Sequence, residues 1–231
     1  MFKGKVYEYL YRNRFEIFLA SLLSILFGSL FFPEDLHIRI VAPILLMFNM
    51  LAGILLISKQ KLLSQIFLAL LFSSIFIFGS NPLVNPDFLN DVKFFELAIN
   101  FIFYSIVTYQ IIRHIWSVKE VNKNVIMGLM CGYISLGLLA FMLFFAIELA
   151  YPGSFQGFNM LTDSPKTVAD SLLYYSFVTL LTIGYGEIFP ISPIAQKVAI
   201  LIGLAGQFYL VIITAVVVEK YIRYLGISAS S

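Results

Sequence analysis

Six long apolar runs dominate the sequence of this chain of 231 residues. They cover about 16–32, 39–57, 62–79, 94–112, 125–150 and 193–219. An α-helix needs roughly 17–25 mostly apolar residues to cross the ~30 Å hydrocarbon core of a bilayer. Each run is therefore long enough to span a membrane, and we expect an all-α membrane protein with six transmembrane helices.

The composition supports the same class. Hydrophobic residues make up 60% of the chain and charged residues only 12%, whereas a soluble domain has about a quarter charged residues. A chain this poor in charge cannot cover its surface with polar groups, so we expect membrane lipids to be its main solvent. The net charge of +2 gives no reason to expect a nucleic-acid partner, and the single cysteine, Cys131, excludes an intrachain disulfide.

The first apolar run follows four basic residues, as the apolar core of a signal peptide does. It is longer than such a core, however, and it ends in Phe31-Phe32-Pro33-Glu34-Asp35 without a small-residue cleavage site. We therefore interpret it as a retained first span.

The orientation follows from the basic residues in the loops. With the N-terminus inside, eleven basic residues fall on the cytoplasmic side: Lys3, Lys5, Arg12, Arg14, Lys59, Lys61, Arg113, Lys119, Lys123, Lys220 and Arg223. Four fall outside: Arg39, Lys93, Lys166 and Lys197. Positive charge concentrates on the cytoplasmic side of membrane proteins, which predicts a multi-pass protein of the cell (inner or plasma) membrane with both termini in the cytoplasm.

A shorter apolar stretch at 167–181 precedes the segment "TLLTIGYGEIFP". At 1.5 Å per residue it reaches only about two-thirds of the way across the ~30 Å core, so we expect a helix that enters the membrane from outside without crossing it. Irregular backbone at that depth is tolerated only where it is buried in protein or lines a wet cavity. Gly184 and Gly186 accept positive φ without penalty, which lets successive carbonyls point to one side, where they can replace the hydration shell of a cation.

The residues Thr182-Ile183-Gly184-Tyr185-Gly186 resemble the selectivity filter of potassium channels, whose usual form is Thr-Val-Gly-Tyr-Gly-Asp. The likeness to bacterial potassium channel pore modules covers a pore domain at 125–222: an outer helix at 125–150, a pore helix at 167–181, the filter at 182–186, Pro190, and an inner helix at 193–220. Ile183 and Glu187 replace the usual Val and Asp, Leu181 stands where a second threonine is common, and Tyr174 and Tyr175 stand where two tryptophans are frequent.

The resemblance implies a homotetramer whose filter binds K⁺ through the carbonyls of Thr182, Ile183, Gly184 and Tyr185. The Thr182 hydroxyl would close the innermost site, and no further cofactor is implied. Related non-selective pores replace the filter tyrosine with an acid, so Tyr185 favours potassium over a non-selective cation channel.

The resemblance also suggests roles for residues around the filter. Tyr174, Tyr175 and Tyr185 would brace it, or would belong to the interfacial aromatic belt. Glu148 would hydrogen-bond the outer pore region or be a solvated helix-end acid, and Glu187 would attract cations or pair with a neighbour. Gly206, and less so Gly203, would be a gating hinge or a point of close helix packing. Gly128 and Gly132 would be points of close helix packing. Thr214 and Ala215 would line the inner cavity.

Residues 1–113 resemble the four-helix voltage-sensor domain of the voltage-gated channel superfamily, but without its charges. The fourth span has one fixed positive charge, Arg113, at its inner end, whereas steep gating uses 3–4 charges per subunit. We therefore expect weak or absent voltage dependence. Residues 114–124 read as an interfacial linker helix that couples this domain to the pore, or as a charged inner loop. Residues 223–231 are a short cytosolic tail, so gating would act through the membrane part, lipid, pH or a separate regulatory subunit.

A secondary transporter or a membrane enzyme is the alternative from another class. No ionisable residue lies at mid-span, where transporters usually couple ions. No catalytic constellation is visible, and His37 and His114 fall on opposite sides of the membrane, so we expect no enzyme activity. Asn49, a polar residue in the middle of the second span, is expected to hydrogen-bond a neighbouring helix rather than a ligand.

Overall fold

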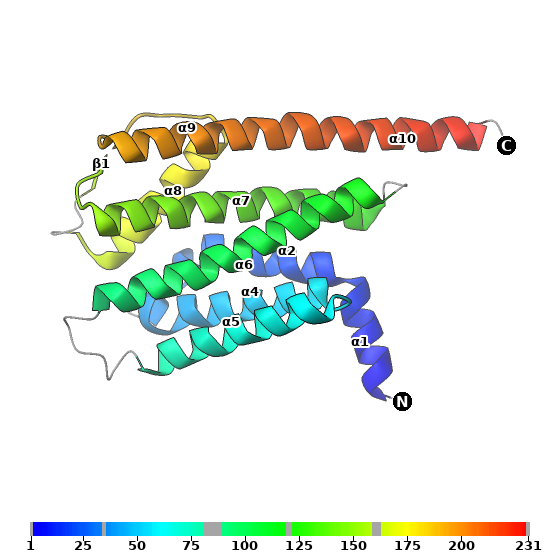
Figure 1. Ribbon diagram of the computed structural model, residues 1–231, viewed down its shortest axis with the longest axis horizontal. Helices are drawn as coiled ribbons and strands as arrows, with labels where there is room; N and C mark the ends of the chain where they lie inside the picture. Colours follow the sequence, from blue (N-terminus) through cyan, green and yellow to red (C-terminus); the bar gives the residue numbers. More distant parts are fainter. Residues whose placement is uncertain (1, 34–35, 81–88, 119–121, 159–162, 230–231) are drawn as a thin grey trace. The chain divides into compact units, whose positions relative to one another are not determined.

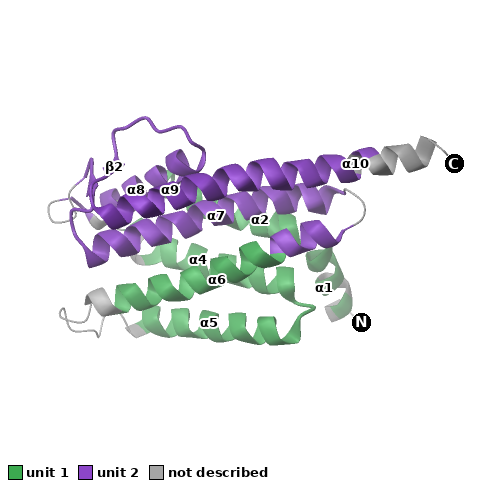
Figure 2. Cartoon of the chain, turned by 45° about the horizontal axis from the view of Figure 1, so that its top comes forward, with its two compact units in different colours: residues 1–110 green, residues 111–231 purple. Residues whose placement is uncertain are grey.

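The computed structural model describes residues 2–33, 36–80, 89–118, 122–158 and 163–229, and within these ranges its regular secondary structure is helical apart from one pair of two-residue strands (Figure 1). Contacts divide the chain into two compact units, unit 1 at residues 1–110 and unit 2 at residues 111–231 (Figure 2).

The regular elements in the described residues of unit 1 are all helical. In chain order it contains α1 (Phe2–Arg12), α2 (Arg14–Phe27), the 3₁₀ turn η1 (Gly28–Leu30), the π-helical turn η2 (His37–Val41), α4 (Ala42–Ile57), α5 (Lys61–Ser80) and most of α6 (Leu89–Ser117). Helices α2 and α4 pack closely, and Gly28 marks a point of near contact because a Cβ there would lie 2.8 Å from Cδ1 of Leu45.

A chain of buried hydrogen bonds joins three helices of unit 1. Nδ2 of Asn49 in α4 donates to Oγ of Ser21 in α2 at 2.8 Å, and the hydroxyl of Tyr104 in α6 donates to Oδ1 of Asn49 at 2.9 Å. The Asn49 and Tyr104 side chains are fully buried and Ser21 is 1% exposed. The prediction that Asn49 serves a neighbouring helix is therefore confirmed, and it serves two.

Unit 2 contains the end of α6 and seven further elements. These are α7 (Lys123–Ala150), β1 (Phe155–Gln156), α8 (Pro165–Leu180), β2 (Phe189–Pro190), α9 (Pro193–Phe208), the π-helical turn η5 (Tyr209–Ile213) and α10 (Thr214–Ala229). Its core is made of apolar side chains of α7, α8 and α9, centred on Phe144, Leu172, Leu180 and Ile202.

The helices α7, α8 and α9 of unit 2 each begin after a residue type that favours the N-cap position. Oγ of Ser164 accepts from the Thr167 N–H at the start of α8, and Oγ of Ser192 accepts from the Ala195 N–H at the start of α9. Proline occupies the first helical position of both helices, where its missing N–H would have had no helical partner. Asn122 caps α7 in the same way through the Val125 N–H.

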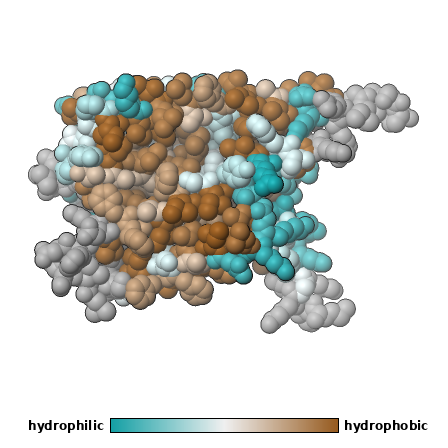
Figure 3. All heavy atoms as spheres, viewed as in Figure 1, coloured by the Kyte–Doolittle hydropathy of each residue, from teal (hydrophilic) through white to brown (hydrophobic). Residues whose placement is uncertain are grey.

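Among the described residues, four helices are long and apolar enough to cross a membrane: Lys61–Gly79, Val92–Ser117, Lys123–Ala150 and Pro193–Lys220. The first two predicted spans appear as shorter helices, since α2 has 14 residues and α4 has 16. The predicted pore helix is α8, whose 16 residues measure about 24 Å. Hydrophobic side chains dominate the face drawn in Figure 3.

The predicted linker helix at 114–124 is described only in part. Residues up to Ser117 continue α6, and α7 begins at Lys123. Lys119, Glu120 and Val121 of the predicted linker lie outside the described residues, as do Glu34 and Asp35 after the first predicted span. The interfacial linker therefore stays a prediction.

The hydrogen-bonded chain through Asn49 generates a first prediction. Asn49→Ala removes the acceptor of the buried Tyr104 hydroxyl, which is left without that bond at a cost of about 1–3 kcal/mol. We expect the melting temperature of the purified protein in detergent to fall.

The matched control is Ser73→Ala, because Oγ of Ser73 is exposed and donates only to the Ala69 carbonyl of its own helix at 3.0 Å. Ser73→Ala should leave the melting temperature unchanged. Equal shifts for the two variants would contradict the role given to Asn49.

Candidate functional site

Helix α8 ends in a Schellman motif. The Ile183 N–H donates to the Val178 carbonyl at 2.9 Å, and the Thr182 N–H donates to the Thr179 carbonyl at 3.0 Å. These are the two bonds of that motif, which places the residue after the cap in the left-handed region. That residue is Thr182, with φ of 55°, although glycine is usual there because a left-handed residue with a Cβ costs roughly 1–2 kcal/mol.

The sign of φ then alternates along residues 182–186, which we call the GYG segment. Thr182, Gly184 and Gly186 have φ of 55°, 60° and 93°, while the φ values of Ile183 and Tyr185 between them are not positive. Positive φ at every second residue is the backbone geometry that allows successive carbonyls to point to the same side, as expected from the sequence of this segment. All five residues are exposed in the single chain.

The strained threonine is held by its own side chain and by α9. Oγ1 of Thr182 donates to the Leu181 carbonyl at 2.7 Å and accepts from Nε2 of Gln207 at 3.2 Å. A strained backbone persists where the surrounding contacts over-determine it, and such residues cluster at functional sites.

The last carbonyl of α8 is a meeting point of three helices. The hydroxyl of Tyr133 in α7 donates to the Leu180 carbonyl at 3.2 Å. A Cβ on Gly206 of α9 would lie 2.4 Å from that carbonyl oxygen. Gly206 therefore has a packing role in this structure, because only glycine lets α9 approach the end of α8 this closely. The alternative role of Gly206 as a hinge stays a prediction.

Glu148 is a buried acid at the end of α7, with 1% of its side chain exposed. Its carboxylate accepts three backbone N–H groups, from Gly153 at 2.7 Å, Ser154 at 3.0 Å and Phe155 at 3.2 Å. Of the two expected roles, a solvated helix end is wrong, and Glu148 instead fixes the loop that follows α7.

That loop in turn holds the chain beyond the GYG segment. β1 pairs antiparallel with β2, with Phe155 opposite Pro190. The Ser154 carbonyl accepts from the N–H groups of Ile191 and Ser192 at 2.8 and 3.2 Å. The carboxylate of Glu148 thus acts through residues 153–155 on the strand that leaves the GYG segment.

The three tyrosines expected to brace the segment lie in different environments. The Tyr174 hydroxyl donates to Oε1 of Glu187, and this hydrogen bond is the main cause that raises the pKa of Tyr174 to about 12, so the hydroxyl keeps its proton at neutral pH. Tyr175 is buried, with its ring against Phe144 and Phe155. Tyr185 exposes 72% of its side chain. Within one chain, Tyr174 acts at the surface and Tyr175 in the core.

The inner helix contains a π-helical turn directly after α9. The hydroxyl of Tyr209, the first residue of η5, donates to the Leu129 carbonyl of α7 at 2.8 Å. A Cβ on Gly132 would lie 2.4 Å from the Tyr209 hydroxyl, so Gly132 is a packing glycine as expected. Gly203 has open space around it, and Thr214 and Ala215 are exposed in the single chain.

The far end of the inner helix is tied to the end of α6. Nζ of Lys220 donates to three backbone carbonyls, those of Ile115 at 2.7 Å, Trp116 at 2.8 Å and Val118 at 2.7 Å. These carbonyls belong to the last turn of α6 and the residues after it, where the partial negative charge of a helix end favours a cation.

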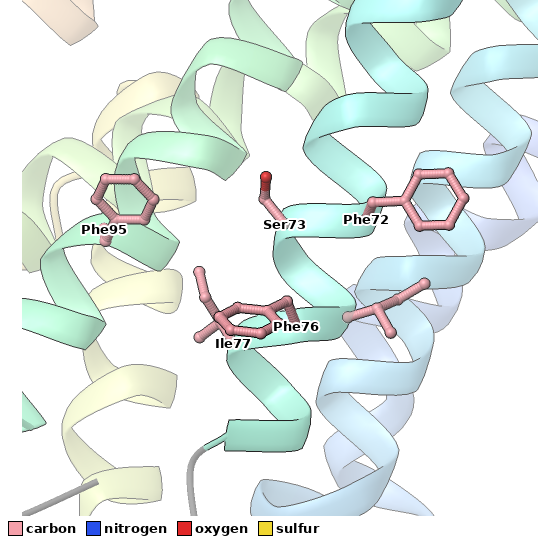
Figure 4. A pocket seen from close by; sticks show the side chains of 6 residues that line it. Phe72, Ser73, Phe76, Ile77 and Phe95 are labelled. Atoms are coloured by element: carbon pink, nitrogen blue, oxygen red, sulfur yellow. The ribbon is translucent and has the colours of Figure 1, made fainter.

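An open apolar groove of about 580 Å³ lies between α5 and α6 in unit 1. Figure 4 shows its lining, with Phe72, Ser73, Phe76 and Ile77 on α5 and Phe95 on α6. Its one hydroxyl, that of Ser73, already donates within its own helix. Apart from Ser73, the side chains that line the groove are apolar.

The fold and the site together define a class of protein. It is a helical membrane protein in which the short helix α8 is followed by the non-helical GYG segment, next to the long apolar helix formed by α9, η5 and α10. Residues 129–223 match a family model described as ion channel. Neither a curated protein nor a solved structure matches the chain. The match runs from α7 into α10, includes the GYG segment, and supports an ion channel domain and passive ion flux in this part of the chain.

Sequence reasoning missed the residues of other helices that hold the GYG segment and the chain on either side of it. Gln207 is one, and its signal in the sequence is a lone amide in an otherwise apolar run. Gln196 is another, since its Nε2 donates to the Ile191 carbonyl at 3.2 Å. Tyr133 gave no signal, because a tyrosine in a membrane helix is ordinary.

The contact between Gly206 and Leu180 generates a second prediction. Gly206→Ala places a Cβ against a backbone oxygen that cannot move aside as a side chain would, and overpacking of this kind costs about 1–3 kcal/mol. We expect a lower melting temperature in detergent.

Gly203→Ala is the matched control, three residues earlier in the same helix, with no atom within 4 Å of the added Cβ. Alanine is the better helix former by about 1 kcal/mol, so this variant should be as stable as the parent or more stable. Similar losses in both variants would refute the packing role of Gly206.

Proposed function

We propose that the protein is a potassium channel that mediates passive K⁺ flux through the GYG segment. The observation that carries the proposal is the alternating sign of φ at Thr182, Gly184 and Gly186, within the stretch that matches the ion channel family. A row of carbonyls on one side of a backbone can replace the water around a cation. The carbonyls of Thr182, Ile183, Gly184 and Tyr185 would bind the ions, with the Thr182 hydroxyl at the innermost position.

One chain supplies only one row of carbonyls, so the channel requires several copies. We propose a homotetramer with cyclic symmetry, because a ring of identical rows encloses an ion evenly. The exposure of the whole GYG segment in the single chain supports this, as does the exposure of Leu204, Phe208 and Val211 on the inner helix. In a tetramer these faces would meet copies or lipid, and Tyr185 would brace the filter against a neighbour.

The membrane arrangement follows the charge pattern of the sequence. We propose six transmembrane helices, with α2 and α4 extended by their flanking turns, and α8 as a re-entrant pore helix. Both termini would lie in the cytoplasm of a cell (inner or plasma) membrane. The buried Glu148 and the Tyr174–Glu187 hydrogen bond support an outer mouth held in shape around the filter.

The third prediction tests conduction and selectivity together. Purified protein in planar bilayers under opposed K⁺ and Na⁺ gradients should give a reversal potential close to that of K⁺, with block by barium. Gly184→Ala should abolish the current, because alanine at φ of 60° disturbs the carbonyl row.

Gly79→Ala is the control for a glycine-to-alanine change. Gly79 lies in α5 of unit 1 and, like Gly184, has no atom within 4 Å of an added Cβ. The Gly79→Ala variant should keep the current of the parent protein. Equal permeability to K⁺ and Na⁺ would favour a non-selective cation channel, and saturable, proton-coupled uptake without channel currents would favour a secondary transporter.

The fourth prediction concerns voltage. The part of α6 buried within unit 1 presents Phe103, Tyr104 and Val107, and Tyr104 is anchored to Asn49 by a neutral hydrogen bond. Arg113 is exposed at the inner end of the helix. Because few charges are available to move across the field, we expect open probability to change little with voltage. Gating that moves several elementary charges per subunit in reconstituted patches would contradict this expectation.

A further inference from the structure

Helix α1 is set apart from the spanning helices. Its 11 residues, FKGKVYEYLYR, end at Arg12, and Figure 1 shows α1 running off at a steep angle to α2. It is short and polar compared with the spans. The side-chain contacts of α1 and its exposed side chains therefore indicate what surrounds this helix.

One side of α1 faces the turn between α4 and α5. The hydroxyls of Tyr7 and Ser58 are 3.0 Å apart, and Nζ of Lys59 lies 4.8 Å from the centre of the Tyr11 ring. The Tyr7 and Tyr11 rings stack with centres 6.0 Å apart. The tyrosines one turn apart thus form the protein-facing side of the helix.

The opposite side of α1 carries its apolar stripe. Phe2, Val6, Tyr9 and Leu10 follow the i, i+4, i+7, i+8 spacing of one helix face. Tyr9 is 58% exposed and Leu10 is 38% exposed. The helix is therefore amphipathic by its sequence, and Tyr9 and Leu10, the described side chains of the apolar face, are exposed on the side opposite Tyr7 and Tyr11.

Basic residues border this stripe. By helix periodicity Lys5 and Arg12 fall along one edge and Lys3 along the other. Arg14, Lys59 and Lys61 add positive charge around the nearby turns, and the acids of this region are Glu8 and Glu16, which leaves six basic residues against two acidic ones. The Arg12 guanidinium lies 5.8 Å from the Tyr9 ring centre, so a charge sits directly beside the apolar face. Figure 3 shows hydrophilic side chains gathered at this end of unit 1.

We propose that α1 is an interfacial helix that binds anionic phospholipids of the cytoplasmic leaflet. Tyr9, Leu10 and their stripe enter the boundary between headgroups and acyl chains, and the flanking Lys and Arg side chains bind lipid phosphates. An amphipathic helix with a basic polar face takes this position, and its binding responds to the lipid charge. The charge complementarity selects an anionic bilayer surface over an apolar protein groove. The proposal depends on the membrane helices and not on which ion the protein conducts.

The test uses the full chain with a single label. In a Cys131→Ala background, which removes the sole native cysteine, Tyr9→Cys and Glu8→Cys are each labelled with an environment-sensitive fluorophore. The proteins are reconstituted in phosphatidylcholine vesicles with or without phosphatidylglycerol. The label at position 9 should shift to the blue and be quenched by lipids spin-labelled near the headgroup, more strongly with phosphatidylglycerol. The label at position 8 should stay accessible to iodide in water.

A charge variant tests the anionic component. Lys5→Gln with Arg12→Gln should remove most of the dependence on phosphatidylglycerol at position 9. The matched control is Lys93→Gln with Lys197→Gln, which removes the same charge from two exposed lysines on the predicted outer side and should leave that dependence intact.

Three results would overturn the proposal. One is a position-9 label that iodide quenches as freely in vesicles as in detergent. A second is protection of that label that rises with the protein-to-lipid ratio, which would indicate a second copy as the partner. The third is a response that phosphatidylglycerol does not change. Because the readout is fluorescence, it stands whether or not the protein conducts K⁺.

Discussion

The end of α8 is the constraint on which the rest of unit 2 depends. The last carbonyls of any helix have no partner within that helix, and a backbone polar group that is buried without a partner costs free energy. Here the Schellman bonds at Thr182 and Ile183 close the helix, and Tyr133 donates to the Leu180 carbonyl. The GYG segment then continues as non-helical backbone, with positive φ at Thr182, Gly184 and Gly186.

The surrounding helices are positioned by what this segment requires. Gly206 lets α9 approach the end of α8, and Gln207, the next residue, reaches the Thr182 hydroxyl. On the other side the buried carboxylate of Glu148 orders the loop that pairs with the strand after Gly186. The segment is thus held at both ends by residues distant in the sequence, and the left-handed threonine is tolerated because of them.

The sequence predicted those features that depend on residue type and spacing alone. Glycine at 184 and 186 signals positive φ, and an apolar stretch too short to cross a bilayer signals α8. Positive φ at Thr182 was not predictable, because residue type argues against it and only the contacts with Thr179 and Gln207 offset the strain. The hydrogen bonds of Glu148 to residues 153–155 were likewise not predictable, because they depend on a reversal of the chain after α7 that no local sequence pattern indicates.

The same distinction holds in unit 1. Apolar composition located α2, α4, α5 and α6. It located neither α1 nor the places where helices change form, such as the 3₁₀ turn at Gly28, where α2 approaches Leu45. The position of Asn49 in an apolar run predicted a hydrogen bond to a neighbouring helix. Its partners, Ser21 and Tyr104, are 28 and 55 residues away in the sequence and could not be chosen without the packing of α2, α4 and α6.

The ammonium group of Lys220 has a mechanical consequence. It binds the middle of α10 to the carbonyl groups of residues 115, 116 and 118 with three charge-assisted bonds. A movement of α10 must therefore either break these three hydrogen bonds together or move the C-terminal end of α6 with it. Through the ammonium group of Lys220, the end of α6 and α10 are coupled mechanically.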